Sequence, residues 1–132
     1  MLNRAVLIGR LTKDPEVSIS KKGNRERAVA RFCIAYNRRY KSGEEWKEES
    51  HFFEIKVFGK LAKVIGERYS KGDLVFVEGR LSQDRWETEE GGKRSRITIV
   101  ADTVRLLRTK GGNVTVEDTN GKEEEDEGEI KF

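Results

Sequence analysis

Apolar side chains recur at alternate positions in several short stretches of the chain, as expected for β-strands that bury one face. The pattern predicts strands over residues 5–11, 27–36, 52–58, 74–81 and 97–107. Glycine, serine or aspartate interrupts the chain between them, and Asp14-Pro15 ends the first stretch. In the second stretch one parity is apolar throughout, so we assign these residues to the core: Ala28, Ala30, Phe32, Ile34 and Tyr36.

The spacing of apolar residues changes between the third and fourth predicted strands. Leu61, Ala62, Val64, Ile65 and Tyr69 fall at helical spacing and predict a helix over residues 60–70, ended by Lys71-Gly72-Asp73. Three strands, a helix and two strands is the order of the five-stranded OB-fold Greek-key barrel, an all-β fold with one short helix. An SH3-like barrel is a weaker alternative because it has no place for the helix.

The alternating pattern ends near Thr109, so we predict a domain over residues 1–108 and a flexible linker with an acidic tail over residues 109–132. Val114 and Val116 could form a further strand, but the sequence favours a linker there. Residues 1–116 contain 25 Lys/Arg and 16 Asp/Glu, whereas residues 117–132 contain 2 and 8. A basic body suits a polyanion, either nucleic acid or an acidic membrane surface. The acidic end has the composition of a disordered segment.

Composition argues against several classes of function. A single Cys and a single His exclude an internal disulfide and a Cys/His zinc site. We interpret Cys33 as a packed strand residue and His51 as a surface residue, although an enzyme that uses the two remains an alternative. No phosphate-binding loop or nucleophile motif can be assembled, so we expect no catalysis, cofactor or metal. Without a long apolar run, we expect neither a transmembrane helix nor export.

The third predicted strand carries aromatic residues on both faces. Alternation places Phe53, Ile55 and Val57 toward the core, and Phe52 and Phe58 toward the opposite side, with Glu54 and Lys56 between them. Exposed rings beside cations suit single-stranded nucleic acid, because bases stack on the rings while cations follow the phosphates. The alternative is that the helix or another subunit covers Phe52 and Phe58.

Two predicted loops repeat the combination of aromatic and basic residues. Asn37-Arg38-Arg39-Tyr40-Lys41 opens a charged loop that contains Trp46, and Asp84-Arg85-Trp86-Glu87 lies in the last hairpin, opposite Lys93, Arg94 and Arg96. We interpret Trp86 as functional because a hydrophilic hairpin offers it little core. Trp46 could equally pack on the barrel rim. Gly9 and Gly79 interrupt strands and predict bends of a closing barrel.

Several segments, in this order, resemble the bacterial single-stranded-DNA-binding protein family. They are Asn3-Arg4-Ala5-Val6-Leu7-Ile8-Gly9-Arg10-Leu11 with Asp14-Pro15-Glu16-Val17, then Phe58-Gly59-Lys60-Leu61-Ala62, then Lys71-Gly72-Asp73-Leu74-Val75-Phe76-Val77-Glu78-Gly79-Arg80-Leu81, and Trp86. The resemblance covers residues 1 to about 108 and the C-terminal tip. It implies an OB fold that assembles, usually as a homotetramer, and wraps single-stranded DNA. It also implies DNA replication, recombination and repair in the bacterial cytoplasm, in association with the nucleoid.

The resemblance also assigns roles to residues. The family's stacking aromatics fall on Tyr40, Phe52, Phe58 and Trp86, and its phosphate-binding cations on Arg4, Lys60, Lys71 and Arg85. The acidic tip would bind replication and repair proteins through Asp126, Glu127, Glu129, Ile130 and Phe132. Family tips read as an Asp run followed by Ile-Pro-Phe, and Lys131 here departs from that pattern. An RNA-binding OB-fold protein of cold-shock or translation type is the alternative function, since stacking does not demand DNA.

Overall fold

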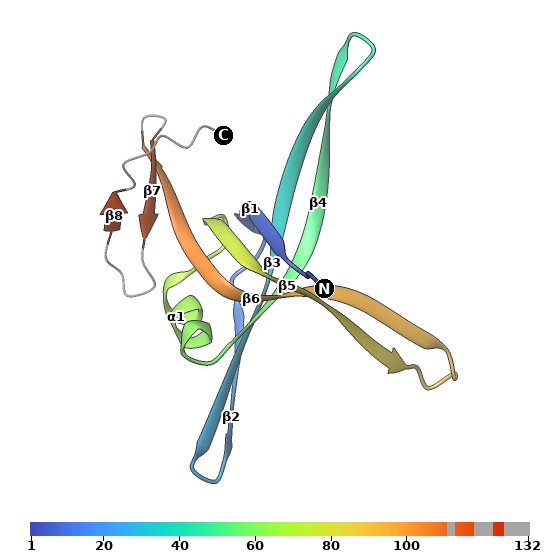
Figure 1. Ribbon diagram of the computed structural model, residues 1–132, viewed down its shortest axis with the longest axis vertical. Helices are drawn as coiled ribbons and strands as arrows, with labels where there is room; N and C mark the ends of the chain where they lie inside the picture. The colour runs from blue at the N-terminus through green and yellow to red at the C-terminus, as the bar shows by residue number, and fades with distance from the viewer. Residues whose placement is uncertain (111–112, 118–122, 126–132) are drawn as a thin grey trace.

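The computed structural model describes residues 1–110, 113–117 and 123–125, which form strands and one short helix (Figure 1). In chain order the elements are β1 (Ala5–Leu11), β2 (Glu16–Lys22), β3 (Arg25–Ser42), β4 (Glu45–Phe58), α1 (Lys60–Arg68), β5 (Leu74–Glu87), β6 (Lys93–Lys110), β7 (Asn113–Glu117) and β8 (Glu123–Glu125). The predicted all-β architecture with one short helix is confirmed. No helix among the described residues is long and apolar enough to cross a membrane.

The strands form one sheet that curls into a barrel. Their order is β2-β3-β1-β5-β6-β7-β8, and β4 pairs with β3 on one side and with β6 on the other. The contact between β4 and β6 is the parallel one, with Ile55 opposite Ile99, and it closes the barrel. Helix α1 connects β4 to β5 and contacts β2, β3 and β4.

The barrel interior holds the residues that alternation assigned to it. Ile34, Ile55, Val57, Val75 and Val77 are almost completely buried, and Ile65 of α1 joins the same core. Ala28, Ala30 and Phe32 are buried as predicted, and Phe53 packs against the cluster while half-buried. In the barrel strands these positions alternate with exposed or half-buried ones, which is why the sequence pattern predicted them as core.

Tyr36 does not belong to this core, and its assignment to it was wrong. Its side chain is 39% exposed, although it keeps the parity of Ile34. The reason is that β3 has left the barrel by this point and pairs only with β4, where Tyr36 lies opposite His51. Parity identifies a face of the strand, but the face is buried only where the barrel continues.

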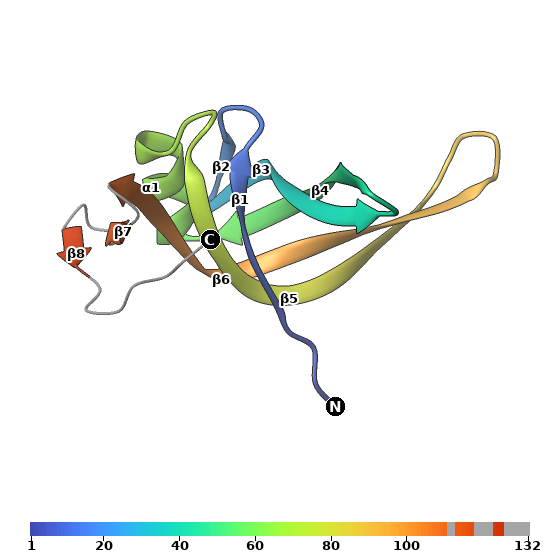
Figure 2. The same cartoon turned by 90° about the horizontal axis from the view of Figure 1, so that it is seen from above.

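Three hairpin arms extend from the barrel, formed by β2–β3, β3–β4 and β5–β6 (Figures 1 and 2). The sequence predicted the buried roots of these strands and missed their outer parts. Strand β2 was missed entirely, because all seven of its residues are exposed and its apolar alternation is limited to Val17 and Ile19. The segments predicted as loops around Tyr40 and Trp46 are strand in the β3–β4 arm.

Two further boundaries differ from prediction. Helix α1 ends at Arg68, and Tyr69 caps it in an extended conformation. Gly72, with a φ of 92°, belongs to the following turn and does not end the helix. Residues 113–117, which the sequence favoured as linker, pair with β6 as strand β7. The domain boundary near residue 108 remains a prediction.

Gly79 lies at a point where two strands approach very closely. The β5–β6 register shifts between Glu78 and Gly79, and a Cβ at position 79 would lie 2.1 Å from the Val100 carbonyl oxygen. This geometry agrees with the predicted bend. Gly9 is similar, because a Cβ there would lie 2.6 Å from the Ala35 carbonyl oxygen.

Substitution Gly79→Ala is therefore expected to lower the free energy of unfolding by about 1–3 kcal/mol or more, because backbone must move to admit the methyl group. Urea unfolding measures the change. Gly92→Ala is the matched control, since its Cβ would meet only the Thr88 Oγ1 atom, at 3.2 Å. A Gly79→Ala variant as stable as the control would contradict the close packing.

Candidate nucleic-acid interface

The outer face of β4 carries two exposed aromatic rings. Phe52 is 63% exposed and Phe58 is 55% exposed. Their partners across the sheet are small, with Phe52 opposite Ala35 and Phe58 opposite Val29, and neither partner covers a ring. Phe52 and Phe58 are thus turned away from the core, as alternation predicted. Neither α1 nor any other described element buries them in this single chain.

A third exposed aromatic, Trp86 of the β5–β6 arm, is connected to this face by Arg96. The Arg96 Cζ atom lies 5.8 Å from the centre of the Trp86 ring, and Trp86 is 46% exposed. The Arg96 Nη1 atom also lies 3.3 Å from the Glu54 Oε2 atom, and Glu54 lies between Phe52 and Phe58 on β4. Arg96 therefore contacts both the ring on the arm and the outer face of β4.

A second contact holds the root of the arm against the same face. The Lys56 ammonium donates a hydrogen bond of 2.9 Å to the Asp84 Oδ2 atom, and Thr98 lies 3.5 Å from that oxygen. These contacts, first of all the hydrogen bond from Lys56, lower the pKa of Asp84 below its ordinary value. We refer to Phe52, Phe58, Trp86, Arg96 and Lys56 as the aromatic–basic face.

Two shallow pockets border the aromatic–basic face. One, of about 410 Å³, lies along the β5–β6 arm beside Trp86 and is lined also by Arg85, Lys93 and Arg94. The other, of about 280 Å³, lies at the root of the arm between Arg31, Glu54 and Arg96. The first pocket is lined mainly by cationic groups, which suits a phosphate backbone. The second also contains Asp14, Glu16 and Glu54, so its charges are balanced.

The outer part of the β3–β4 arm carries Trp46 on one face and Tyr40 on the other. Trp46 has the parity of Phe52 and is 64% exposed, with Arg39 5.8 Å from its ring centre. It does not pack on the barrel rim. Tyr40 is half-buried on the opposite face of the arm, 5.7 Å from the Arg38 Cζ atom. The structure thus brings Trp46 to the side of Phe52 and places Tyr40 on the other.

The four basic residues assigned by resemblance differ in their surroundings. Lys60 begins α1 two residues after Phe58, and Lys71 lies in the turn after the helix, where its backbone N–H donates to the Asp14 Oδ1 atom at 2.8 Å. Arg85 is exposed on the arm and donates to the Gln83 side chain at 2.9 Å.

Arg4 is already paired with acidic groups. Its guanidinium forms ion pairs with Glu78 and Asp102, the second at 2.9 Å. The hydrogen bond with Asp102 raises the pKa of Arg4 and lowers that of Asp102. The guanidinium to which the resemblance assigned a phosphate contact is thus paired with two carboxylates of the same chain.

A row of arginines on β3 was not singled out from the sequence. Arg31 lies opposite Lys56, and Arg27 lies two positions beyond Val29, the partner of Phe58. Arg25 continues the row toward the tip of the β2–β3 arm, opposite Lys22. The sequence could have shown this row, because the positions of β3 that alternate with its core residues are rich in arginine.

The strand register separates Cys33 from His51. Cys33 lies opposite Glu54, and His51 lies opposite Tyr36, three positions further along β3 and therefore on the other face. Sγ of Cys33 and the imidazole do not form a nucleophile–base pair. In the part of the chain that the structure describes, no three His, Cys, Asp or Glu side chains are grouped so as to hold a metal ion.

The lowered pKa of Asp84 predicts a dependence of stability on pH. Because its pKa is lower in the folded than in the unfolded state, Asp84 stabilises the fold above its unfolded pKa of about 3.9. That stability is lost as the pH falls through the folded pKa. Urea unfolding at a series of pH values from neutral into the acid range should show a smaller decrease in stability for Asp84→Asn than for the parent chain. An identical decrease would contradict the Lys56–Asp84 contact.

The partner-binding residues Asp126, Glu127, Glu129, Ile130 and Phe132 lie outside the described residues. Their assignment remains a prediction.

The chain is similar to known proteins in both sequence and fold. The model of the Single-strand binding protein family matches residues 2–107. The single-stranded DNA-binding protein of Aquifex aeolicus is 45% identical over the whole of both chains, and that of Treponema pallidum is 45% identical over 89% of this chain and 65% of its own. The single-stranded DNA-binding protein of Staphylococcus aureus strain MRSA252 is 38% identical, over 89% of this chain and 73% of its own.

The fold is also similar to that of a solved structure. The Plasmodium falciparum SSB complex with ssDNA superposes with a TM-score of 0.73 at 25% identity and covers 82% of this chain and 97% of its own. The OB fold predicted from the order of the elements is therefore confirmed. With most of its length matched by the family model and by relatives at 45% identity, the chain belongs to the single-strand binding protein family.

Proposed function

We propose that this protein binds single-stranded DNA without reading its sequence, and protects the strand during replication, recombination and repair. The observation that carries the proposal is the aromatic–basic face, where Phe52, Phe58 and Trp86 are exposed beside Lys56 and Arg96. Bases of any identity can stack on such rings, each for about 1–3 kcal/mol. The phosphates would be neutralised by exposed cations such as Lys60, Lys71 and Arg85, since Lys56 and Arg96 are already paired with carboxylates. A duplex hides its base faces, so the surface selects for strandedness.

The relatives support this proposal. Those compared above are named single-stranded DNA-binding proteins, and the solved neighbour is a complex with ssDNA. Of the assigned residues, Phe52, Phe58, Trp86 and Arg85 are the ones whose exposure suits direct contact, together with Lys60 and Lys71 on either side of α1. Tyr40 would contact a strand that passes over the tip of the β3–β4 arm.

Competition between homopolymers separates the proposal from its RNA-binding alternative. Labelled oligo-dT bound to the protein is challenged with unlabelled poly-dT or poly-U, and release is followed by fluorescence anisotropy. Poly-dT is expected to compete at lower nucleotide concentration than poly-U. Stronger competition by poly-U would favour an RNA-binding function instead.

We also propose that the protein assembles, with a homotetramer as the expected state. An apolar groove of about 790 Å³ runs along the outer side of β1, lined by Val6, Ile8, Leu74 and Phe76 among others. Val6 is 54% exposed in the single chain, and a groove of this kind suits a second copy of the same surface. Sedimentation equilibrium would give the number of subunits.

The remaining parts of the proposal concern location and partners. We place the protein in the bacterial cytoplasm with the nucleoid, without catalytic activity of its own. The acidic tip would recruit replication and repair proteins, because Ile130 and Phe132 offer apolar anchors and the preceding carboxylates offer attraction to a basic pocket. Removal of residues 126–132 is expected to abolish such recruitment while oligo-dT binding persists.

A further inference from the structure

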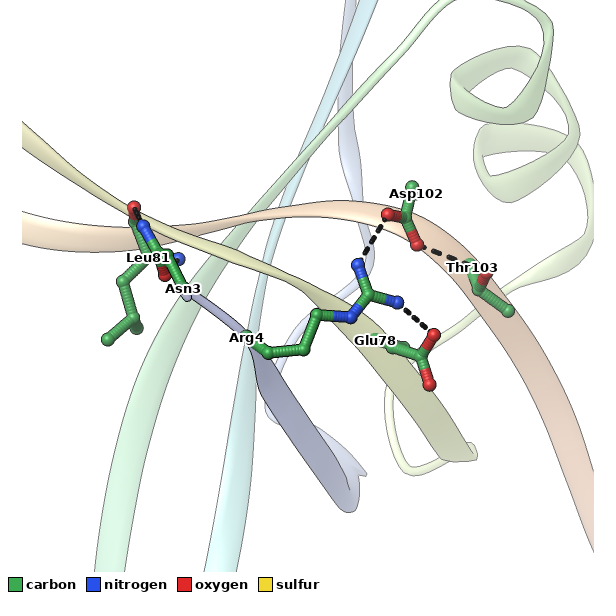
Figure 3. A network of polar contacts seen from close by, with 6 residues as sticks. All are labelled: Asn3, Arg4, Glu78, Leu81, Asp102 and Thr103. Atoms are coloured by element: carbon green, nitrogen blue, oxygen red, sulfur yellow. Dashed lines mark hydrogen bonds and ion pairs between the residues drawn. The ribbon is translucent and has the colours of Figure 1, made fainter. Parts of the chain in front are cut away.

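The N-terminal segment is tied to the β5–β6 arm by two neighbouring side chains (Figure 3). Asn3 and Arg4 precede β1, which begins at Ala5. Asn3 forms hydrogen bonds with Leu81 of β5, which lies just beyond the register shift at Glu78 and Gly79. Arg4 forms ion pairs with Glu78 of β5 and Asp102 of β6. These contacts lie where β5 and β6 leave the barrel as an arm.

Asn3 replaces a pair of backbone hydrogen bonds with its side chain. The antiparallel register places Ala5 opposite Gly79, so that two residues earlier Asn3 falls opposite Leu81. The Asn3 Nδ2 atom donates to the Leu81 carbonyl oxygen at 2.8 Å, and its Oδ1 atom accepts from the Leu81 N–H at 2.9 Å. An amide side chain carries one donor group and one acceptor, as the backbone does, and thereby prolongs the ladder by one pair.

Arg4 bridges the two strands of the arm just before they diverge from the barrel. Its guanidinium contacts Glu78 of β5 through one terminal nitrogen and Asp102 of β6 through the other, the latter at 2.9 Å. Thr103 donates a further hydrogen bond to Asp102 at 3.2 Å. A planar guanidinium can engage two carboxylates at fixed positions, which a lysine cannot do with the same geometry.

We propose that Asn3 and Arg4 are positioning residues, which hold the β5–β6 arm at the angle that presents Trp86 to a bound strand. Lys56 of β4 holds the arm through Asp84, and Asn3 and Arg4 hold it from the segment that precedes β1. We call the contacts of Asn3 and Arg4 with the arm the clamp. Its effect on DNA affinity rests on the proposed function, but the clamp itself does not. Arg4 in this role acts through the arm and makes no phosphate contact of its own.

The mobility of the arm tests the clamp without DNA. In a Trp46→Phe background Trp86 is the single tryptophan. Asn3→Ala is expected to lower its fluorescence anisotropy and to speed amide hydrogen exchange at Leu81 about 30-fold, since two hydrogen bonds are lost at about 1 kcal/mol each and 1.4 kcal/mol is a factor of ten. Leu2→Ala, which alters the neighbouring exposed residue, is the matched control. Equal exchange and anisotropy in Asn3→Ala and Leu2→Ala would overturn the clamp.

A second background checks that the effect is local. With Trp86→Phe, Trp46 of the β3–β4 arm is the single tryptophan, and Asn3→Ala is expected to leave its anisotropy unchanged. Equal loosening of both arms would indicate general destabilisation and overturn the positioning role.

Titration with labelled oligo-dT then distinguishes positioning from contact. Arg4→Gln is expected to weaken binding about fivefold while the slope of log affinity against log salt stays unchanged. A direct phosphate contact would instead reduce that slope by about 0.7. A reduced slope, or full affinity in Asn3→Ala despite a looser arm, would overturn the positioning role. A parent chain that does not bind oligo-dT would refute the proposed function, and the exchange and anisotropy measurements would still decide the clamp.

Discussion

Replacing Phe52 and Trp86 together by alanine is expected to weaken oligo-dT binding between about 30-fold and about 10⁴-fold. Each ring stacks on a base for about 1–3 kcal/mol, and each 1.4 kcal/mol is a factor of ten in affinity. Phe52 lies on β4 and Trp86 on the β5–β6 arm, so one strand must cross the face between them to use both. Anisotropy of a fluorescent oligo-dT measures the change, since the variant loses a tryptophan.

Ile19→Ala provides the control for loss of exposed apolar surface. Ile19 is 54% exposed on β2 and has the parity of Val17, opposite Ala28, away from the aromatic–basic face. The control is expected to bind with the parent affinity. Urea unfolding of both variants should give parent-like stability, because none of the three side chains is buried. Equal affinities of the double variant and Ile19→Ala would contradict stacking on Phe52 and Trp86.

The second large effect concerns stability. Ile55→Ala is expected to lower the free energy of unfolding by about 2–5 kcal/mol, through loss of burial and the cavity left behind. Ile55 is fully buried and lies opposite Ile99, where β4 and β6 close the barrel. Domains of this size are stable by about 5–15 kcal/mol, so the loss is a large share of the total.

Ile97→Ala is the matched control, with the same change on the neighbouring strand. Ile97 is 64% exposed on β6, and its replacement is expected to change stability by less than about 0.5 kcal/mol. Urea unfolding with an unchanged dependence on denaturant measures both variants. A similar loss in the two variants would mean that the barrel does not close at Ile55.

The barrel could be predicted because its strands have one buried face and one solvated face. Ala30, Phe32 and Ile34 alternate with exposed or half-buried residues, and the structure buries all three. The arms could not be predicted in the same way, because both of their faces are solvated and no alternation is required there. Strand β2 and the outer parts of β3 and β4 were therefore missed. Tyr36 was assigned to the core although β3 has already left the barrel at this residue.

The candidate site was predictable in part for a similar reason. Outward parity identified Phe52 and Phe58, and a ring without a core to reach identified Trp86. The contacts of Arg96 with Trp86 and Glu54 could not be predicted, because they depend on how β4 and β6 close the barrel. Resemblance alone assigned Arg4 to a phosphate, and it carried no information on Glu78 and Asp102, which come from distant strands.

Intrinsic tryptophan fluorescence tests single-strand stacking most directly, during titration with oligo-dT and with the matching duplex at low and moderate salt. Trp46 and Trp86 are both exposed on the side of Phe52, so bases that stack on them should quench their emission. We expect strong quenching by the single strand alone. The logarithm of the binding constant should fall by about 0.7 per neutralised phosphate for each tenfold rise in salt concentration. Absence of quenching by either nucleic acid, or equal quenching by both, would contradict a single-strand stacking surface.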